Sequence, residues 1–94
     1  MIEVNPEGGG DPLAFSVVVR DGRSETRHAV TLSAADHARL AKGTAPEALI
    51  QAAFAFLLER EPKEAILSRF DVSVIARYYP EFEDELPRYL EPPE

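Results

Sequence analysis

The sequence predicts a single α+β domain, in which an N-terminal antiparallel β-hairpin is followed by a helical C-terminal part packed round one apolar central helix. Two runs rich in β-branched residues, 13–20 and 23–32, flank an Asp-Gly dipeptide that is typical of a tight hairpin turn. A nearly continuous apolar run over residues 48–58 follows a helix-start signal. The chain has 94 residues, which is the size of one ordinary domain with one modest core.

Composition and charge exclude several functions. Apolar residues make up 45% and charged residues 29% of the chain, as in soluble globular proteins. The absence of cysteine excludes disulfides, thiolate metal sites and cysteine nucleophiles. The formal net charge is −7, and residues 44–94 hold eleven acidic against five basic residues. This sign disfavours a phosphate-binding protein; only residues 20–42, which net +2 and contain both histidines, would attract an anionic partner.

The domain is expected to span residues 1–94 in four parts. Residues 1–12, with three glycines and two prolines, are predicted as a flexible lead-in, and 13–32 as the hairpin. Residues 33–90 are predicted as helices, and the prolines in 91–94 predict a frayed tail. The start carries no basic leader, and the longest nearly apolar run has eleven residues, whereas a membrane span needs about 20. A cytoplasmic location is therefore expected.

The register of the hairpin follows from centring its turn on Asp21-Gly22. The pairs that this predicts on the apolar face are Val17–Thr26, Phe15–His28 and Leu13–Val30. Polar residues then share the other face, as a sheet with one wet side requires. The same register places Arg20 opposite Arg23, an unfavourable pairing of like charges at the tip.

Helix boundaries are predicted by capping residues and prolines. Ser33 caps a short first helix that Gly43 ends, and Thr44 caps the apolar helix, which runs to about residue 61 because Pro62 cannot continue it. Asp71 is expected to cap a further helix. The remaining helices are predicted over 62–70, 72–79 and 80–86.

The apolar helix is predicted to bury more than one face. Its large side chains cover an arc of about 200°, whereas a surface helix needs only about 100°. Ala48, Ala52 and Ala55 form a small-residue side that allows a second helix to approach closely. We identify these alanines as a candidate self-association face. Either a second copy in a homodimer or the C-terminal helices of the same chain would fill it.

Catalytic and metal-binding residues are not predicted, and no cofactor is expected. His28 faces the core in the predicted register, and His37 lies on the short first helix; two histidines alone do not make a zinc site. No serine lies in a Gly-x-Ser-x-Gly setting. The acidic cluster 81–85 lacks the spacing of a calcium loop and is interpreted as a solvated surface.

The order of the strand RHAVTLS, a short helix, Gly43-Thr44 and the helix EALIQAAFAFLL resembles the ribbon-helix-helix DNA-binding family. The resemblance implies a dimer in which a paired strand places outward side chains in the major groove. Carried over by position, the outward residues are Arg27, Ala29 and Thr31. With the basic residues of the hairpin, the candidate DNA contacts are Arg20, Arg23, Arg27 and Thr31.

A longer segment, LLEREPKEAILSRFDVSVIARYYPEFE, is similar to the C-terminal half of a family of short bacterial proteins of unassigned function. These share the order of hairpin, apolar helix, Arg-Glu-Pro, Phe-Asp and Tyr-aromatic-Pro-Glu. The resemblance supports the fold and implies no catalytic residues.

We therefore expect a small, soluble, non-enzymatic interaction or regulatory module that binds a protein partner or itself. Nucleic acid, membrane and metal are not the expected partners. One alternative is a ribbon-helix-helix-like DNA-binding or antitoxin-type regulator. A second alternative is a small enzyme that uses His28 or His37.

Overall fold

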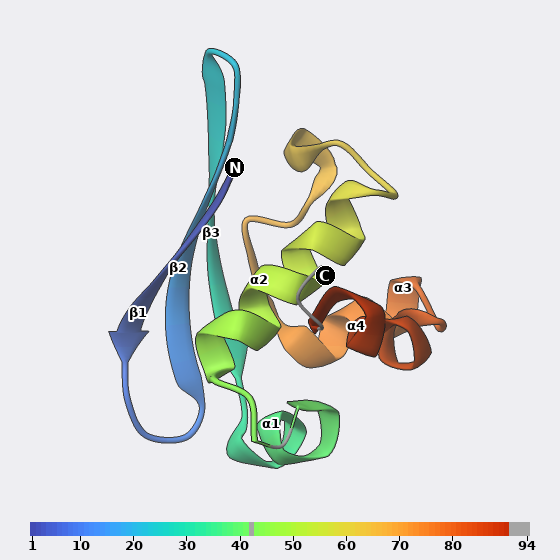
Figure 1. Ribbon diagram of the computed structural model, residues 1–94. Coiled ribbons are helices and arrows are strands. Elements are labelled where there is room, and N and C mark those ends of the chain that lie inside the picture. Colours follow the sequence, from blue (N-terminus) through green and yellow to red (C-terminus); the bar gives the residue numbers. More distant parts are fainter. Residues whose placement is uncertain (42, 91–94) are drawn as a thin grey trace.

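The computed structural model describes residues 1–41 and 43–90 and has an α+β fold, as predicted. A four-stranded sheet in the order β1-β2-β3-β4 forms one layer, and the helices form the other (Figure 1). The strands are β1 (Ile2–Gly8), β2 (Leu13–Asp21), β3 (Ser24–Leu32) and β4 (Arg69–Asp71). The predicted tail, 91–94, lies outside the described residues.

The predicted hairpin is formed by β2 and β3, but its turn lies one residue later than predicted. Asp21 pairs with Ser24, so the two turn residues are Gly22 and Arg23, and Gly22 has a φ of 63°. Glycine adopts this left-handed conformation without the strain that a side chain adds. Partners consequently shift by two residues, which leaves each side chain on its predicted face.

The observed pairs are Val17–His28, Phe15–Val30 and Leu13–Leu32 in place of those predicted. At the tip, Arg20 lies opposite Glu25 rather than Arg23, and its guanidinium contacts the Glu25 carboxylate at 3.3 Å. The later turn therefore replaces a like-charge pair by an ion pair, which accounts for the preference between the two registers.

The flexible lead-in predicted for 1–12 is wrong for most of its length, because Ile2–Gly8 forms β1 and pairs antiparallel with β2. Ile2 and Val4 pack against the core, whereas Glu3 and Asn5 between and beyond them are exposed. Two alternating apolar positions are too few to predict a strand so close to three glycines. Pro6 is tolerated because β1 is an edge strand, and the pairing becomes irregular just after it.

Side-chain caps mark the start of some helical segments on the covered face, but not of α2. The described residues form four α-helices and two 3-10 turns: α1 (Ala34–Ala41), α2 (Pro46–Leu58), η1 (Lys63–Ala65), η2 (Val72–Val74), α3 (Ile75–Tyr78) and α4 (Phe82–Leu90). The Ser33 hydroxyl accepts a hydrogen bond from the Asp36 amide at 3.0 Å, which confirms the predicted cap. Thr44 does not cap α2; Ala45 occupies the N-cap, without a side-chain hydrogen bond, and Pro46 begins the helix.

The region after α2 differs most from the prediction. Instead of a helix over 62–70, a single 3-10 turn is followed by β4, which pairs parallel to β3 over Ala29–Thr31. The Ala29 amide donates to the Ser68 carbonyl, and Phe70 packs on Phe54, with ring centres 5.9 Å apart. Pairing with β3 thus makes residues 69–71 a strand where a helix is predicted.

The predicted helix over 72–79 is divided into η2 and α3, and its cap is confirmed because the Asp71 carboxylate accepts from the Ser73 amide at 3.0 Å. The last helix, α4, extends past its predicted end at residue 86 and includes Pro87.

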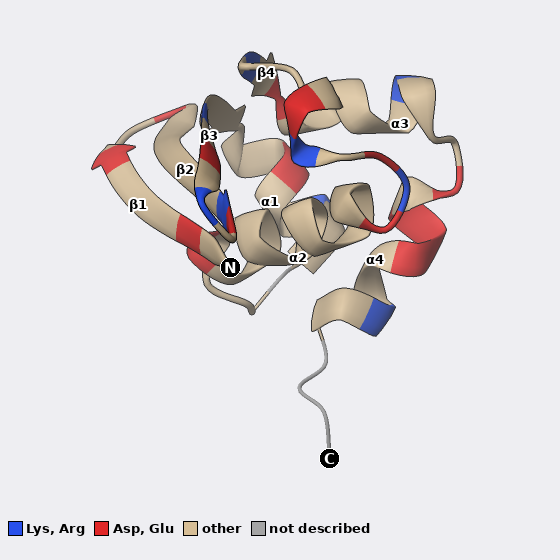
Figure 2. Ribbon diagram, turned by 90° about the horizontal axis from the view of Figure 1, so that it is seen from above, with Lys and Arg blue, Asp and Glu red and all other residues tan. Residues whose placement is uncertain are grey.

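The main core lies between the sheet and the helices. Seven residues of α2 are buried, among them Phe54 toward the sheet and Phe56 toward α4. None of the helices that the structure describes lies on the opposite face of the sheet (Figure 1). Figure 2 shows acidic residues gathered on the first turn of α4 and along β1. Among the described residues, none of the helices has the length and hydrophobicity needed to cross a bilayer.

Candidate functional site

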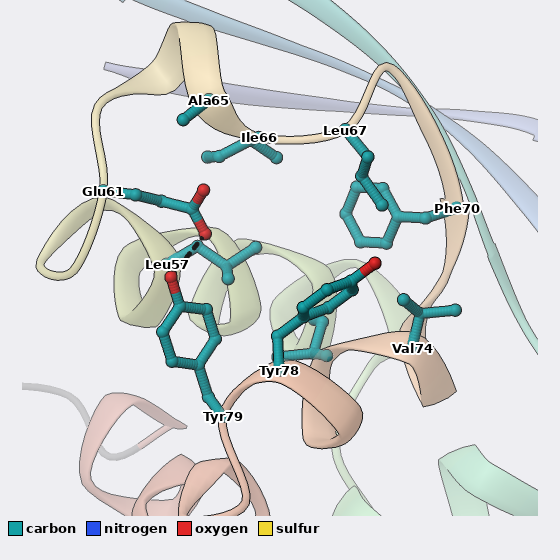
Figure 3. Close-up of a pocket in the computed structure, with 10 residues that line it drawn as sticks. Leu57, Glu61, Ala65, Ile66, Leu67, Phe70, Val74, Tyr78 and Tyr79 are labelled. Carbon is teal, nitrogen blue, oxygen red and sulfur yellow. Dashed lines mark hydrogen bonds between the residues drawn. The ribbon is translucent and has the colours of Figure 1, made fainter.

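An apolar pocket of about 190 Å³ opens at the C-terminal end of α2. We call it the α2–α3 pocket. Its ten lining residues come from the end of α2, the η1–β4 segment and α3: Leu57, Glu61, Ala65, Ile66, Leu67, Phe70, Val74, Ile75, Tyr78 and Tyr79. Figure 3 shows these side chains surrounding one space, with Glu61 and Tyr79 at one end and Phe70 and Val74 at the other.

Two large apolar side chains on the rim of this pocket remain in contact with solvent. Tyr78 is 67% exposed and Leu67 is 48% exposed. Apart from Met1, they are the only large hydrophobic side chains among the described residues that are this exposed. Contiguous exposed apolar surface next to a cavity is typical of an interaction site.

The floor of the pocket belongs to the main core. Leu57, Ile75 and Ile66 are buried and contribute the apolar base, while Phe70 connects it to β4. The elements η1, β4 and α3 are each only a few residues long. Their positions therefore depend on the packing of these side chains in the core. The pocket is therefore formed by short elements fixed on a rigid helix.

One end of the pocket carries its only charged side chain. The Tyr79 hydroxyl donates to Glu61 Oε2 at 2.9 Å (Figure 3). This hydrogen bond to the carboxylate, together with burial, raises the pKa of Tyr79. Tyr79 therefore stays a neutral donor at physiological pH, and Glu61 Oε1 has no hydrogen-bond partner among the described residues.

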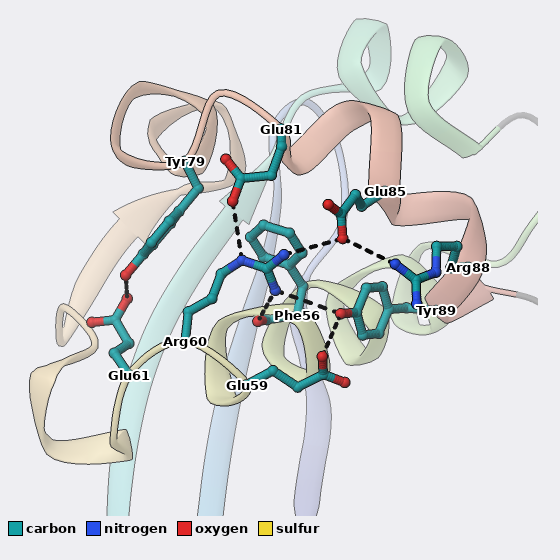
Figure 4. Close-up of polar contacts among 9 residues, drawn as sticks. All are labelled: Phe56, Glu59, Arg60, Glu61, Tyr79, Glu81, Glu85, Arg88 and Tyr89. Atoms are coloured by element: carbon teal, nitrogen blue, oxygen red, sulfur yellow. Dashed lines mark hydrogen bonds and ion pairs between the residues drawn. The ribbon is translucent and has the colours of Figure 1, made fainter.

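A separate polar network joins α2 to α4 next to the pocket (Figure 4). Arg60 donates to Glu81 Oε2 at 3.2 Å and to Glu85 Oε1 at 3.1 Å. Its guanidinium carbon lies 3.6 Å from the centre of the Phe56 ring. A backbone hydrogen bond and the Arg60 guanidinium both lower the pKa of Glu81. None of the hydrogen bonds that Arg60 makes among the described residues goes to Glu61.

The acidic cluster 81–85 thus has a structural role that the sequence reading missed. Glu81 and Glu85 bind Arg60, and Glu83 binds Arg39 of α1 at 2.6 Å. The described residues contain no group of three potential ligands placed to hold a metal ion.

The candidate self-association face is divided by the fold. Ala52 is 2% exposed, so it belongs to the core and is not available to a second copy. Ala55 is half-buried, and Ala48 is exposed. The C-terminal helix α4 packs on α2 through Phe56 and Phe82, with ring centres 5.0 Å apart. Helix α4 therefore covers part of the α2 surface within the same chain.

The four candidate DNA contacts do not form one available basic patch. Arg20 binds Glu3 and Glu25, and Arg27 binds Glu25. The Thr31 hydroxyl donates to Asp71 Oδ1 at 2.5 Å. Arg23 lies in the exposed hairpin turn. In addition, β3 is paired on both sides, to β2 and to β4, where a ribbon dimer would need an open strand edge.

The two histidines are held by structural hydrogen bonds. His28, buried at 4% exposure, contacts the Leu67 carbonyl through Nδ1 at 2.7 Å and Thr26 Oγ1 through Nε2 at 2.8 Å. Because a carbonyl only accepts, Nδ1 carries a proton and donates. His37 Nε2 likewise contacts the Thr44 carbonyl at 2.6 Å. Neither ring is hydrogen-bonded to a carboxylate among the described residues.

Sequence reasoning did not identify the pocket. The one available signal was the pair Tyr78-Tyr79, because the side chains of two successive residues leave the backbone in different directions. No family model, no curated protein and no solved structure matches the chain.

Proposed function

We propose that the protein is a non-enzymatic interaction module that holds a side chain of a protein partner in the α2–α3 pocket. The observation that carries this proposal is the position of Leu67 and Tyr78, which flank the same apolar pocket and are both exposed. Covering them with a partner would remove their apolar surface from water, which is the main favourable term in association.

The size of the pocket supports a side chain rather than a small metabolite. Its volume is about 190 Å³, and sites for drug-sized ligands usually measure about 300–1,000 Å³. Leu67 and Tyr78 at the rim would then surround the anchored residue and exclude water. Such a buried anchor with a surrounding rim is the usual arrangement of an interaction hot spot.

We also propose that the rest of the domain packs around the apolar helix α2. The buried residues of α2 face both the sheet and α4, and Leu57 at its end forms part of the pocket floor. In this view α2 provides the rigid base, and the short segments after it provide the walls.

Two other functions receive less support. A DNA-binding role would require Arg20 and Arg27 to leave their carboxylate partners. An enzymatic role for His28 or His37 would require a ring nitrogen that is available to a substrate, and the contacts with Leu67 and Thr44 occupy one nitrogen of each. We propose neither.

The proposal is tested by selecting random heptapeptides on the wild-type protein by phage display. We expect selected peptides to shift the amide NMR signals of residues that line the α2–α3 pocket. Their affinity should fall at least tenfold in the double variant Leu67→Ser/Tyr78→Ser, because both substitutions remove exposed apolar surface without opening the core. The double variant Arg23→Ser/Ala48→Ser changes two exposed positions elsewhere and should bind like wild type.

Sedimentation of the wild type and the pocket variant at micromolar concentration decides whether the partner is a second copy. A dimer that becomes monomeric in Leu67→Ser/Tyr78→Ser would identify self-association through this pocket, and a monomer in both would leave a different protein as partner. Peptides that bind the pocket variant as well as wild type, or a selection without enrichment, would refute the proposal.

A further inference from the structure

The α2–α3 pocket combines apolar and aromatic walls with a single carboxylate. Of its ten lining residues only Glu61 is charged, and it lies at one end of the pocket beside Tyr79 (Figure 3). A ligand of matching chemistry has an apolar body and a cationic end. A lysine side chain has this form, because its four methylene groups are apolar and its ammonium group is a compact charge.

We propose that the partner presents a lysine, whose stem lies against Ile66, Phe70 and Ile75 and whose ammonium group binds Glu61. This inference rests on the proposed function and names the residue that the pocket accepts. The carboxylate is available for the contact, because Tyr79 occupies only Oε2 among the described residues. The hydrogen bond from Tyr79 also fixes the orientation of the carboxylate at the end of the pocket.

The aromatic side chains strengthen the case for a cation. Tyr78, Tyr79 and Phe70 all line the pocket, and the electron-rich face of an aromatic ring attracts an ammonium group. Tyr78 has no aromatic partner among the described residues, whereas Tyr79 contacts Phe56 edge-to-face and Phe70 packs at a tilt against Phe54. The ring of Tyr78 is therefore the one left to cover an incoming side chain.

Charge on the rest of the molecule acts in the same direction. The formal net charge of −7 attracts basic segments and raises their association rate. Arginine matches the pocket less well. Its planar fork pairs best with two carboxylate oxygens at once, and one oxygen of Glu61 already accepts from Tyr79. Lysine, which binds as a point charge, needs only the other oxygen.

The test compares three blocked pentapeptides, Ac-Ala-Ala-X-Ala-Ala-amide, in which X is lysine, norleucine or arginine. Each is titrated by NMR into the wild-type protein, Glu61→Gln and Glu47→Gln. The Glu61→Gln variant removes the charge and still accepts a hydrogen bond from Tyr79. The control Glu47→Gln makes the same charge change at an exposed position at the start of α2.

We expect the lysine peptide to shift pocket signals and to bind at least fivefold more tightly than the norleucine peptide. Its dissociation constant should rise at least fivefold in Glu61→Gln and stay within twofold in Glu47→Gln, whereas norleucine binding should not respond to either. Norleucine binding as tightly as lysine, arginine binding more tightly, or no effect of Glu61→Gln would each overturn the lysine assignment. Those results leave the proposed function standing if the display selection still yields pocket-dependent peptides; loss of both would refute both.

Discussion

The guanidinium carbon of Arg60 lies 3.6 Å from the ring centre of Phe56 on α2, and the same group pairs with the carboxylates of Glu81, just before α4, and Glu85, within α4. Arg60 therefore contributes an apolar contact, a cation–π contact and two ion pairs at once. Its charged end connects α4 to α2, the helix that forms the base of the candidate site (Figure 4).

Replacing Arg60 by alanine should lower the midpoint of thermal unfolding, because Glu81 and Glu85 lose their shared cation and Phe56 loses its cover. Circular dichroism during heating measures the effect. Arg88→Ala is a matched control, since Arg88 is exposed and contacts only Glu85 within this network. The change in Arg60→Ala should exceed that in Arg88→Ala, and equal changes would mean that the network adds nothing to stability.

Replacing His28 by alanine should destabilise the fold by about 2–4 kcal/mol, because it leaves the Leu67 carbonyl without its donor and opens space beside Phe54. Chemical denaturation measures this difference. His37→Ala is the comparison, as His37 is only half-buried, and its cost should be smaller. A stable His28→Ala protein would show that the contact between β3 and the segment before β4 is dispensable.

Replacing Phe54 by alanine tests the central role proposed for α2. Phe54 is completely buried between His28 and Phe70. We expect a loss of about 3–5 kcal/mol, the usual cost of removing a buried aromatic ring. Gln51→Ala on the exposed side of the same helix should be nearly neutral in the same denaturation experiment. A small loss in Phe54→Ala would contradict the packing described for the core.

Acid should weaken the fold through Asp71. Burial of its carboxyl raises the pKa, but hydrogen bonds from Thr31 and Ser73 outweigh burial, so the pKa lies below the usual 3.8. The unfolded chain then binds the proton more readily than the native state. The stabilisation is complete above the unfolded pKa and is lost as pH falls through the folded one.

The variant Asp71→Asn keeps the shape of the side chain without its titration. We expect it to be less stable than wild type at pH 7, where the charged acceptor is stronger, and to lose less stability between pH 5 and pH 3. Urea midpoints across this range provide the measurement. If the urea midpoints of the two proteins fell equally between pH 5 and pH 3, another carboxylate would account for the loss of stability in acid.

Local signals in the sequence predicted the hairpin and the helix cap at Ser33, because turn and capping preferences act over a few residues. The cap of the apolar helix was placed one residue early, at Thr44 instead of Ala45. The turn was placed one residue early because Asp-Gly and Gly-Arg both include the required glycine. Only the complete set of cross-strand pairs between β2 and β3 distinguishes the two turns. Strands β1 and β4 were missed because each is defined by its partner strand rather than by its own alternation.

The candidate site was less accessible to sequence reasoning than the fold. Leu67 and Tyr78 look like other apolar residues of the chain, and only the tertiary arrangement determines which of them stay exposed. The partners of Arg60 lie 21 and 25 residues further along the chain, beyond the reach of helix-spacing rules. The acidic run was therefore interpreted as solvated, although two of its members bind this arginine.

The parallel pairing of β3 with β4 has a consequence for how the chain can be divided. The hydrogen-bonded residues Thr31 and Asp71 are 40 positions apart, and α1 and α2 lie between them. A cut between α2 and β4 would leave β3 with an unpaired edge on one fragment and a three-residue strand on the other. Neither piece would be a smaller folding unit, so the domain has to be expressed, fused or grafted whole.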